Sequence, residues 1–168
     1  MSTKLDVRDF DTQRKVSQEV KLNVLAGARL TGSGNNSQHW KFILVQDRSN
    51  IRKLADDSTT GKWAQRCNFA VIILTDPKLP FYLIDAGRAI QDMQLAAWNS
   101  GLASGLFTGM SDVRLKKDFD IPSEYEATAV VCFGYPNRKI TGRKKNRKAL
   151  SDISFLEKFG NPMDPRRL

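Results

Sequence analysis

The apolar positions of the chain fall into short runs that predict strands and helices in alternation. Residues 69–75 are continuously apolar, which predicts a strand buried on both faces, and residues 127–133 predict another buried strand. Residues 40–46 are rich in aromatic and β-branched side chains and predict another strand, and residues 103–108 predict a short one that leads to Gly109.

Helical spacing of apolar residues predicts two longer helices, over residues 17–30 and 82–100, the first with Ser17 as its N-cap. Shorter helices are expected over residues 49–57, 112–118 and 151–159. The second long helix should turn its buried stripe inward through Ala86, Ala89, Ile90, Met93, Ala97 and Leu102. Helices interspersed with buried strands predict an α+β or α/β class, with a mixed sheet flanked by helices.

The length of 168 residues suits a single domain over residues 1–168, and 40% hydrophobic with 27% charged residues is typical of globular proteins. The longest strongly apolar run, residues 69–74, is far too short to span a bilayer. The first residues lack an apolar stretch, so no secretory signal is predicted and a cytoplasmic location is expected.

The chain has two cysteines, Cys67 and Cys132, and one histidine, His39. Neither cysteine belongs to a CxxC pair, so no metal site is expected. Cys132 lies in an apolar run and is interpreted as a buried thiol that acts as a small hydrophobe. A nucleophilic Cys–His pair is the alternative, and nothing in the sequence supports it.

The formal net charge is +9, and residues 138–148 hold seven basic residues and no acid. Such a segment is a solvated face, a phosphate site for a small molecule, or a nucleic-acid footprint, and composition alone does not choose. The segment after Pro136 has little core of its own, so residues 137–168 are predicted to form a basic extension that docks on a partner subunit.

A loop rich in glycine, serine and asparagine lies between the first helix and the first strand. Its string, residues 33–42 (SGNNSQHWKF), resembles the "P-S-x-x-N-x-Q-P-W-x-F" signature of the nitroreductase family of FMN-dependent NAD(P)H oxidoreductases. Gly32 and His39 stand where that signature has proline. His39 is therefore interpreted as a tolerated loop substitution rather than a catalyst, with contact to a substrate left open.

Further segments resemble the same family in the same order along the chain. Residues 4–10 (KLDVRDF) are similar to "R-R-S-x-R-x-F", and residues 85–97 to its "D-x-G-x-A-x-Q-N-x-x-L-A-A" helix. Residues 104–109 resemble the segment that lies against the flavin ring, residues 134–136 its "G-Y-P", and residues 145–150 its "K/R-x-R-x-P-L".

The resemblance implies an intertwined homodimer that binds FMN at two-subunit sites. Lys4, Lys145 and Arg147 would hold the phosphate, while Arg8 would lie near the ribityl chain and the pyrimidine edge. Asp6 replaces a serine, which puts an acid beside a dianion. The backbone N–H groups of Thr108 and Gly109 would face flavin N5. The full set of implied FMN-binding residues is Lys4, Asp6, Arg8, Ser33, Gly34, Asn36, Gln38, Leu106, Thr108, Gly109, Lys145 and Arg147.

The implied activity is electron transfer from NADH or NADPH to a small electron-poor acceptor, such as a nitroaromatic or a quinone, by a ping-pong mechanism. No side chain is then expected to act as an acid or base, because the flavin carries the chemistry. Two alternatives are a flavin-binding sensor or carrier of the same fold without turnover, which Asp6 and His39 suggest, and a basic nucleic-acid-binding module. The second explains the charge but not the motifs. Neither a membrane nor a metal partner is expected.

Overall fold

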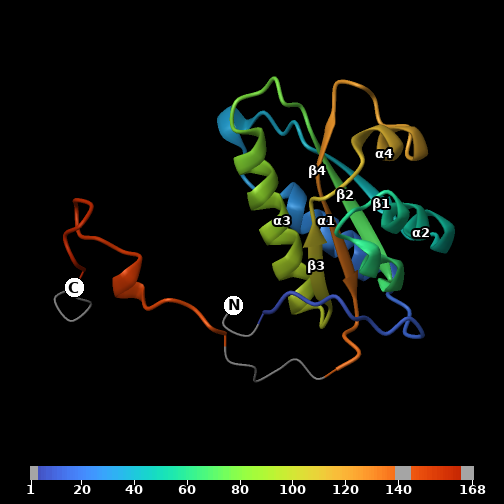
Figure 1. Ribbon diagram of the computed structural model, residues 1–168, viewed down its shortest axis with the longest axis horizontal. Helices are drawn as coiled ribbons and strands as arrows, with labels where there is room; N and C mark the ends of the chain where they lie inside the picture. Colours follow the sequence, from blue (N-terminus) through green and yellow to red (C-terminus); the bar gives the residue numbers. More distant parts are fainter. Residues whose placement is uncertain (1–3, 139–144, 164–168) are drawn as a thin grey trace.

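Figure 1 shows the computed structural model of the chain, which describes residues 4–138 and 145–163. Its strands are β1 (Lys41–Val45), β2 (Phe69–Thr75), β3 (Ala103–Phe107) and β4 (Glu126–Gly134). Its α-helices are α1 (Gln18–Arg29), α2 (Arg48–Asp56), α3 (Tyr82–Asn99) and α4 (Asp112–Asp118), and its 3-10 helices are η1 (Gly34–Asn36), η2 (Lys62–Arg66) and η3 (Leu150–Asp152). Apart from the last predicted helix, each predicted element forms within a residue or two of its expected bounds.

The four strands form one sheet in the order β1-β2-β4-β3, and every neighbouring pair is antiparallel. The predicted combination of helices with a sheet is confirmed. The parallel part of the expected mixed sheet is limited, within the described residues, to one isolated bridge between Asp6 and Ser104 at the outer edge of β3.

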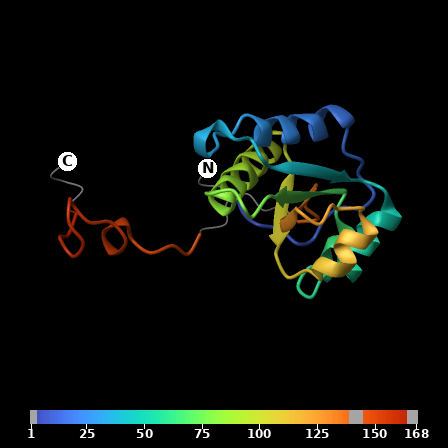
Figure 2. The same cartoon turned by 90° about the horizontal axis from the view of Figure 1, so that it is seen from above.

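Helices cover both faces of the sheet, as Figure 2 shows from above. On one face, α1 and α3 pack on Phe69, Val71 and Ile73 of β2. On the other face, Ala70, Ile72 and Leu74 of the same strand join a second cluster with residues of α2 and α4. Because alternate side chains of a strand point to opposite faces, this burial explains why β2 reads as a continuous apolar run.

Local signals fix the ends of the helices. The Ser17 hydroxyl accepts a hydrogen bond from the backbone N–H of Val20 at 3.3 Å, and the Asp47 carboxylate accepts from the N–H groups of Ser49 and Asn50. Caps of this kind are each worth about 1 kcal/mol. At the C-terminal end of α3, Gly101 has a φ of 75°, and this left-handed conformation ends the helix.

The prediction of a helix over residues 151–159 is wrong. Only η3, Leu150–Asp152, is helical there, and the chain then doubles back so that Phe155 and Pro162 form an antiparallel bridge. Glu157 and Gly160 have positive φ, which a helix does not tolerate. The segment lacks a body surface on which a short amphipathic helix would be stabilised.

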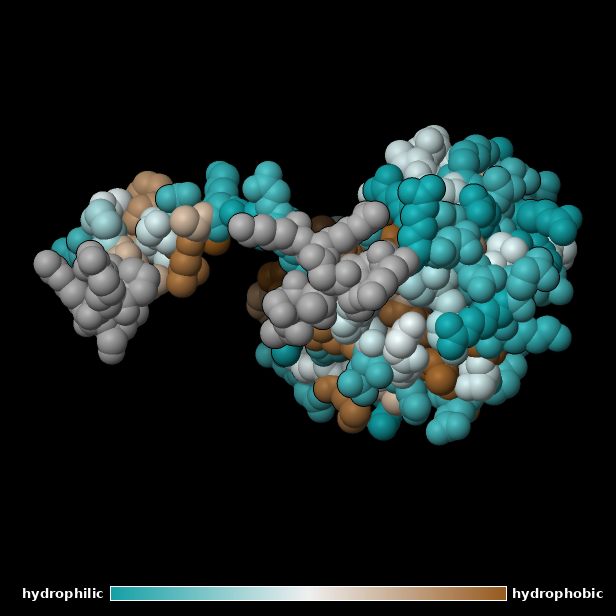
Figure 3. Space-filling view, turned by 90° about the horizontal axis from the view of Figure 1, so that it is seen from below, coloured by the Kyte–Doolittle hydropathy of each residue, from teal (hydrophilic) through white to brown (hydrophobic). Residues whose placement is uncertain are grey.

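Residues 145–163, the C-terminal arm, extend away from the body of the molecule (Figures 1 and 3). Large apolar side chains are exposed on it: Leu150, Ile153, Phe155, Leu156 and Phe159. Three of the seven basic residues of segment 138–148, namely Lys139, Arg143 and Lys144, lie outside the described residues. Within the described ranges no helix is long and apolar enough to cross a membrane.

Candidate functional site

The N-terminal segment lies along the free edge of β3. The backbone N–H of Val7 donates to the carbonyl of Ser104 at 2.8 Å, next to the Asp6–Ser104 bridge. Gly105 permits this approach, because a Cβ at that position would collide with the Val7 carbonyl oxygen. The segment that carries Lys4, Asp6 and Arg8 is therefore fixed to the sheet by its backbone.

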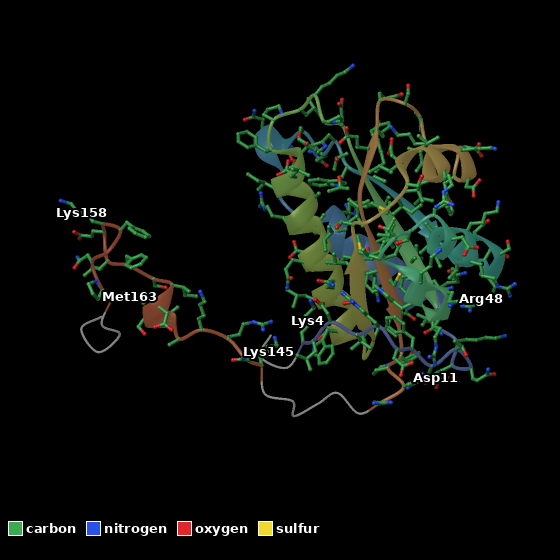
Figure 4. All side chains as sticks on the ribbon, in the orientation of Figure 1. Lys4, Asp11, Arg48, Lys145, Lys158 and Met163 are labelled. Atoms are coloured by element: carbon green, nitrogen blue, oxygen red, sulfur yellow. The ribbon has the colours of Figure 1, made fainter. Side chains whose placement is uncertain are left out.

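Lys4 meets the C-terminal arm at one cavity, and Figure 4 shows Lys4 and Lys145 on the same side of the body. This lysine cavity has a volume of about 420 Å³. It is lined by Lys4, Leu5, Asp6, Gln91, Leu95, Lys145 and Arg147. Three predicted phosphate ligands from the two ends of the chain thus share one cavity.

The Lys4 side chain is 14% exposed and its ammonium is held by two neighbours. It donates to the Asp6 Oδ1 at 3.0 Å and to the Gln94 Oε1 at 2.8 Å, and the Gln94 amide lies 3.4 Å from the same Asp6 oxygen. Gln94, on the inner side of α3, had no place in the sequence-based site, because a glutamine within a core helix carries no pattern of its own.

A second cavity of about 380 Å³ adjoins the first and shares Leu5 and Asp6 with it. Its lining is Leu5, Asp6, Val7, Arg8, Asp9, Pro136 and Arg138, and it is called the arginine cavity here. The Arg8 guanidinium lies 5.6 Å from the ring centre of Trp63, a cation–π contact. Trp63 also packs edge-on against Phe107, so it braces Arg8 against the end of β3. Sequence reasoning missed Trp63, which lies in a short 3-10 helix without a recognisable motif.

Thr108 and Gly109 follow β3 and line neither cavity. The Gly109 carbonyl accepts from the Ser58 hydroxyl at 2.8 Å and from the Thr59 N–H at 3.0 Å. A Cβ on Gly109 would lie 2.5 Å from the Thr59 hydroxyl, so a larger residue would have to displace that side chain. Leu106 is half-buried beside the core on the α1 and α3 face.

The loop that carries Ser33, Gly34, Asn36 and Gln38 is held by a carboxylate of α3. Both oxygens of Asp85 accept from the Gly34 N–H, at 3.0 and 3.2 Å, and the Ser33 hydroxyl accepts from the Gln38 N–H at 3.0 Å. Asn35, Asn36 and Gln38 all have φ near +50°, a conformation that asparagine tolerates better than most residues.

His39 is buried, and its Nε2 lies 3.3 Å from Asp85 Oδ2, while its Nδ1 has no hydrogen-bond partner among the described residues. The histidine therefore braces the loop from within. The expectation that it is not a catalyst stands as a prediction.

The loop and the lysine cavity contact different parts of α3. Asp85, in its first turn, holds the loop, whereas Gln94 holds Lys4. Nine residues of α-helix separate these two positions, about 14 Å along the axis. Gln38 lines a separate groove with residues of α1 and β1. A single chain thus brings together Lys4, Asp6, Arg8, Lys145 and Arg147, and leaves Ser33, Gly34, Asn36, Gln38, Leu106, Thr108 and Gly109 outside the two cavities.

Several known proteins resemble this chain in sequence or in fold. A protein from Archaeoglobus fulgidus, provisionally named NADH dehydrogenase/NAD(P)H nitroreductase, is 29% identical over 143 residues, which cover 80% of this chain and 82% of that protein. A 5,6-dimethylbenzimidazole synthase from Rhodospirillum rubrum is 25% identical over 80% of this chain and 79% of its own length. The structure of an FMN-dependent nitroreductase from Clostridium difficile superposes with a TM-score of 0.85 at 21% identity, over 94% of this chain and 97% of that one.

The model of the nitroreductase family matches residues 3–66 and 61–135. The match includes the N-terminal segment, the loop, α3 and β3, and it ends before Lys145 and Arg147. Since it covers well over half of the sequence, the chain belongs to the nitroreductase family.

Proposed function

We propose that this protein binds FMN and transfers electrons from NADH or NADPH to a small electron-poor acceptor, such as a nitroaromatic or a quinone, in a ping-pong reaction. The observation that carries the proposal is the lysine cavity, where Lys4 from one end of the chain meets Lys145 and Arg147 from the other. The names of the related proteins, an FMN-dependent nitroreductase among them, support the same assignment.

The residues present fit the chemical parts of FMN. Its phosphate carries close to two negative charges at neutral pH, and three cationic side chains line the lysine cavity. Charge-assisted hydrogen bonds of this kind are about twice as strong as neutral ones. The adjoining arginine cavity would take the rest of an elongated ligand, with Arg8 near the edge of the ring that becomes anionic on reduction.

When bound, FMN supplies the two-electron chemistry at its N5 position. Arg8, held over Trp63, would orient the pyrimidine edge and stabilise negative charge there. The N–H groups of Thr108 and Gly109 would face N5, in a turn fixed by Ser58 and Thr59. In this mechanism the protein orients the reactants, and no side chain accepts or donates a proton.

The protein is proposed to act as a homodimer. Within one chain, the Asp85-held loop and the lysine cavity contact opposite parts of α3, so the loop of a second copy would complete each site. Phe81, Leu83 and Ile84 are exposed at the start of α3, and the C-terminal arm exposes five further large apolar side chains. Such unpartnered apolar surface is typical of an interface between subunits. The arm would dock on the partner.

Anaerobic titration of the purified protein with NADH and then NADPH tests the function. Bound oxidised flavin should make the protein yellow, and reduced nicotinamide should bleach that visible absorbance. A nitroaromatic or a quinone should then restore the colour. Bound flavin that neither nicotinamide reduces would indicate a carrier or sensor instead. A protein that neither contains nor takes up FMN would overturn the proposal.

A further inference from the structure

The lysine cavity contains an acid among its cations. The Asp6 carboxylate lines both cavities, 3.0 Å from the Lys4 ammonium and within reach of the Gln94 amide. It is therefore placed where an anionic ligand of Lys4 would bind.

The backbone of Asp6 is held at the edge of β3. It is bridged to Ser104, and the next residue donates its N–H to the Ser104 carbonyl at 2.8 Å. The side chain is 60% exposed, so rotation about its own bonds is the freedom that remains to it. An entering phosphate would either displace the carboxylate from Lys4 or bind beside it.

Both outcomes lower the affinity for a dianion. Displacement breaks the Lys4–Asp6 ion pair, and coexistence places like charges close together in a partly desolvated cavity. Neither cost applies to a ligand of the same shape without a phosphate.

We infer that Asp6 is a built-in counter-ion that sets the charge preference of this cavity, weakening its hold on doubly charged phosphate ligands relative to uncharged analogues. The inference rests on the proposed FMN site. With Asp6 present, FMN would be bound less tightly than the three cations of the cavity alone would bind it.

The test compares FMN with riboflavin, which has the same ring and ribityl chain but no phosphate. Dissociation constants are measured by flavin fluorescence quenching for the wild type, Asp6→Asn and Asp6→Ser. Removing the charge should tighten FMN binding about tenfold and change riboflavin binding by less than about twofold. The FMN effect should shrink as salt is raised from low to high concentration, because screening weakens it.

Asp112→Asn is the matched control. Asp112 pairs with Lys116 at 3.1 Å and is 57% exposed, much like Asp6 beside Lys4, but it lies on α4 and lines neither cavity. It makes the same change in net charge and should leave both affinities unaltered.

An unchanged or weaker FMN affinity in both Asp6 variants would overturn the inference, as would an equal gain for riboflavin. If the wild type binds FMN more tightly than riboflavin and the Asp6 variants have the same FMN dissociation constant as the wild type, the inference fails and the proposed function survives. If no variant binds either flavin, both fail.

Discussion

At the residue scale, two neighbouring cations of the basic segment differ in their relation to the lysine cavity. Both Arg147 and the next residue, Lys148, are exposed, but only Arg147 lines the lysine cavity. Arg147→Ala should therefore weaken FMN binding about tenfold or more, since a phosphate loses a charge-assisted partner. Flavin content after purification and the FMN dissociation constant measure the effect.

Lys148→Ala removes the same charge and serves as the control. It should retain flavin as the wild type does. Equal loss in both variants would mean that the general positive charge of the segment, rather than a specific contact, attracts the ligand.

Asp57 illustrates a cost within the fold. Burial, and next the nearby Asp118, raise the pKa of its carboxyl above the ordinary value of about 3.9. It also sits at the C-terminal end of α2, where negative charge is unfavourable, and its Oδ2 lacks a hydrogen-bond partner among the described residues. The folded protein therefore holds this proton more tightly than the unfolded chain does.

Stability should consequently fall as the pH rises from about 3.9 through the raised pKa of Asp57. Asp57→Asn lacks this loss, and we expect it to be more stable than the wild type by about 1 kcal/mol at pH 7, with the difference disappearing at acidic pH. Urea unfolding across pH measures the free energy of unfolding. Asp56 is 78% exposed on the same helix, so Asp56→Asn should change the free energy of unfolding little. A less stable Asp57→Asn protein at pH 7 would contradict the prediction.

At the scale of elements, Gly105 of β3 decides where the N-terminal segment lies. Gly105→Ala would place a Cβ against the Val7 carbonyl, so the segment should separate from β3 at a cost of about 1–3 kcal/mol. Hydrogen exchange at the Val7 amide should accelerate, and FMN affinity should fall because Lys4 and Arg8 move with the segment.

Ser104→Ala is the control, because the Val7 N–H bonds to the backbone carbonyl of Ser104 and that group is retained. Unchanged protection of the Val7 amide in Gly105→Ala would show that the sheet edge accommodates the methyl group.

Most elements could be predicted because their signals are local. The buried run of β2, the Ser17 cap of α1 and the Gly101 stop of α3 each act within a few residues. The helix over residues 151–159 could not be excluded in this way, because its apolar spacing suits a helix and only the absence of a supporting surface in the body opposes it.

The site was predictable in part for the same reason. Lys4, Lys145 and Arg147 came from motif resemblance, and the structure brings them to one cavity. Gln94 and Trp63 could not be found in advance, since their contacts with Lys4 and Arg8 depend on how distant segments pack. The brace between His39 and Asp85 joins residues 46 positions apart and has no sequence signature.

At the scale of the whole molecule, the arm contributes nothing to the hydrophobic core of the body. Neither hydrophobic cluster of the body contains a residue of the arm. A chain that ends after Ala149 keeps Lys145 and Arg147, and its body should fold with nearly the wild-type melting temperature. If the proposed homodimer forms through the arm, this shortened chain should be mostly monomeric, because the exposed apolar side chains of the arm are gone.

Light scattering coupled to gel filtration measures the mass, and circular dichroism checks the fold. A full-length Ile153→Ser/Phe159→Ser variant tests the apolar contacts without shortening the chain. A truncated protein that remains fully dimeric would place the interface on α3 alone.

The two cysteines have a practical consequence. Cys67 and Cys132 are in contact, both are fully buried, and burial raises the pKa of Cys132. A thiol-specific reagent needs an accessible thiolate, so labelling should occur only in molecules whose core has opened. The labelling rate at increasing reagent concentration then measures the free energy of that opening directly, with no fluorescent tag or added mutation, and bound cofactor should slow it in proportion to its stabilisation of the fold.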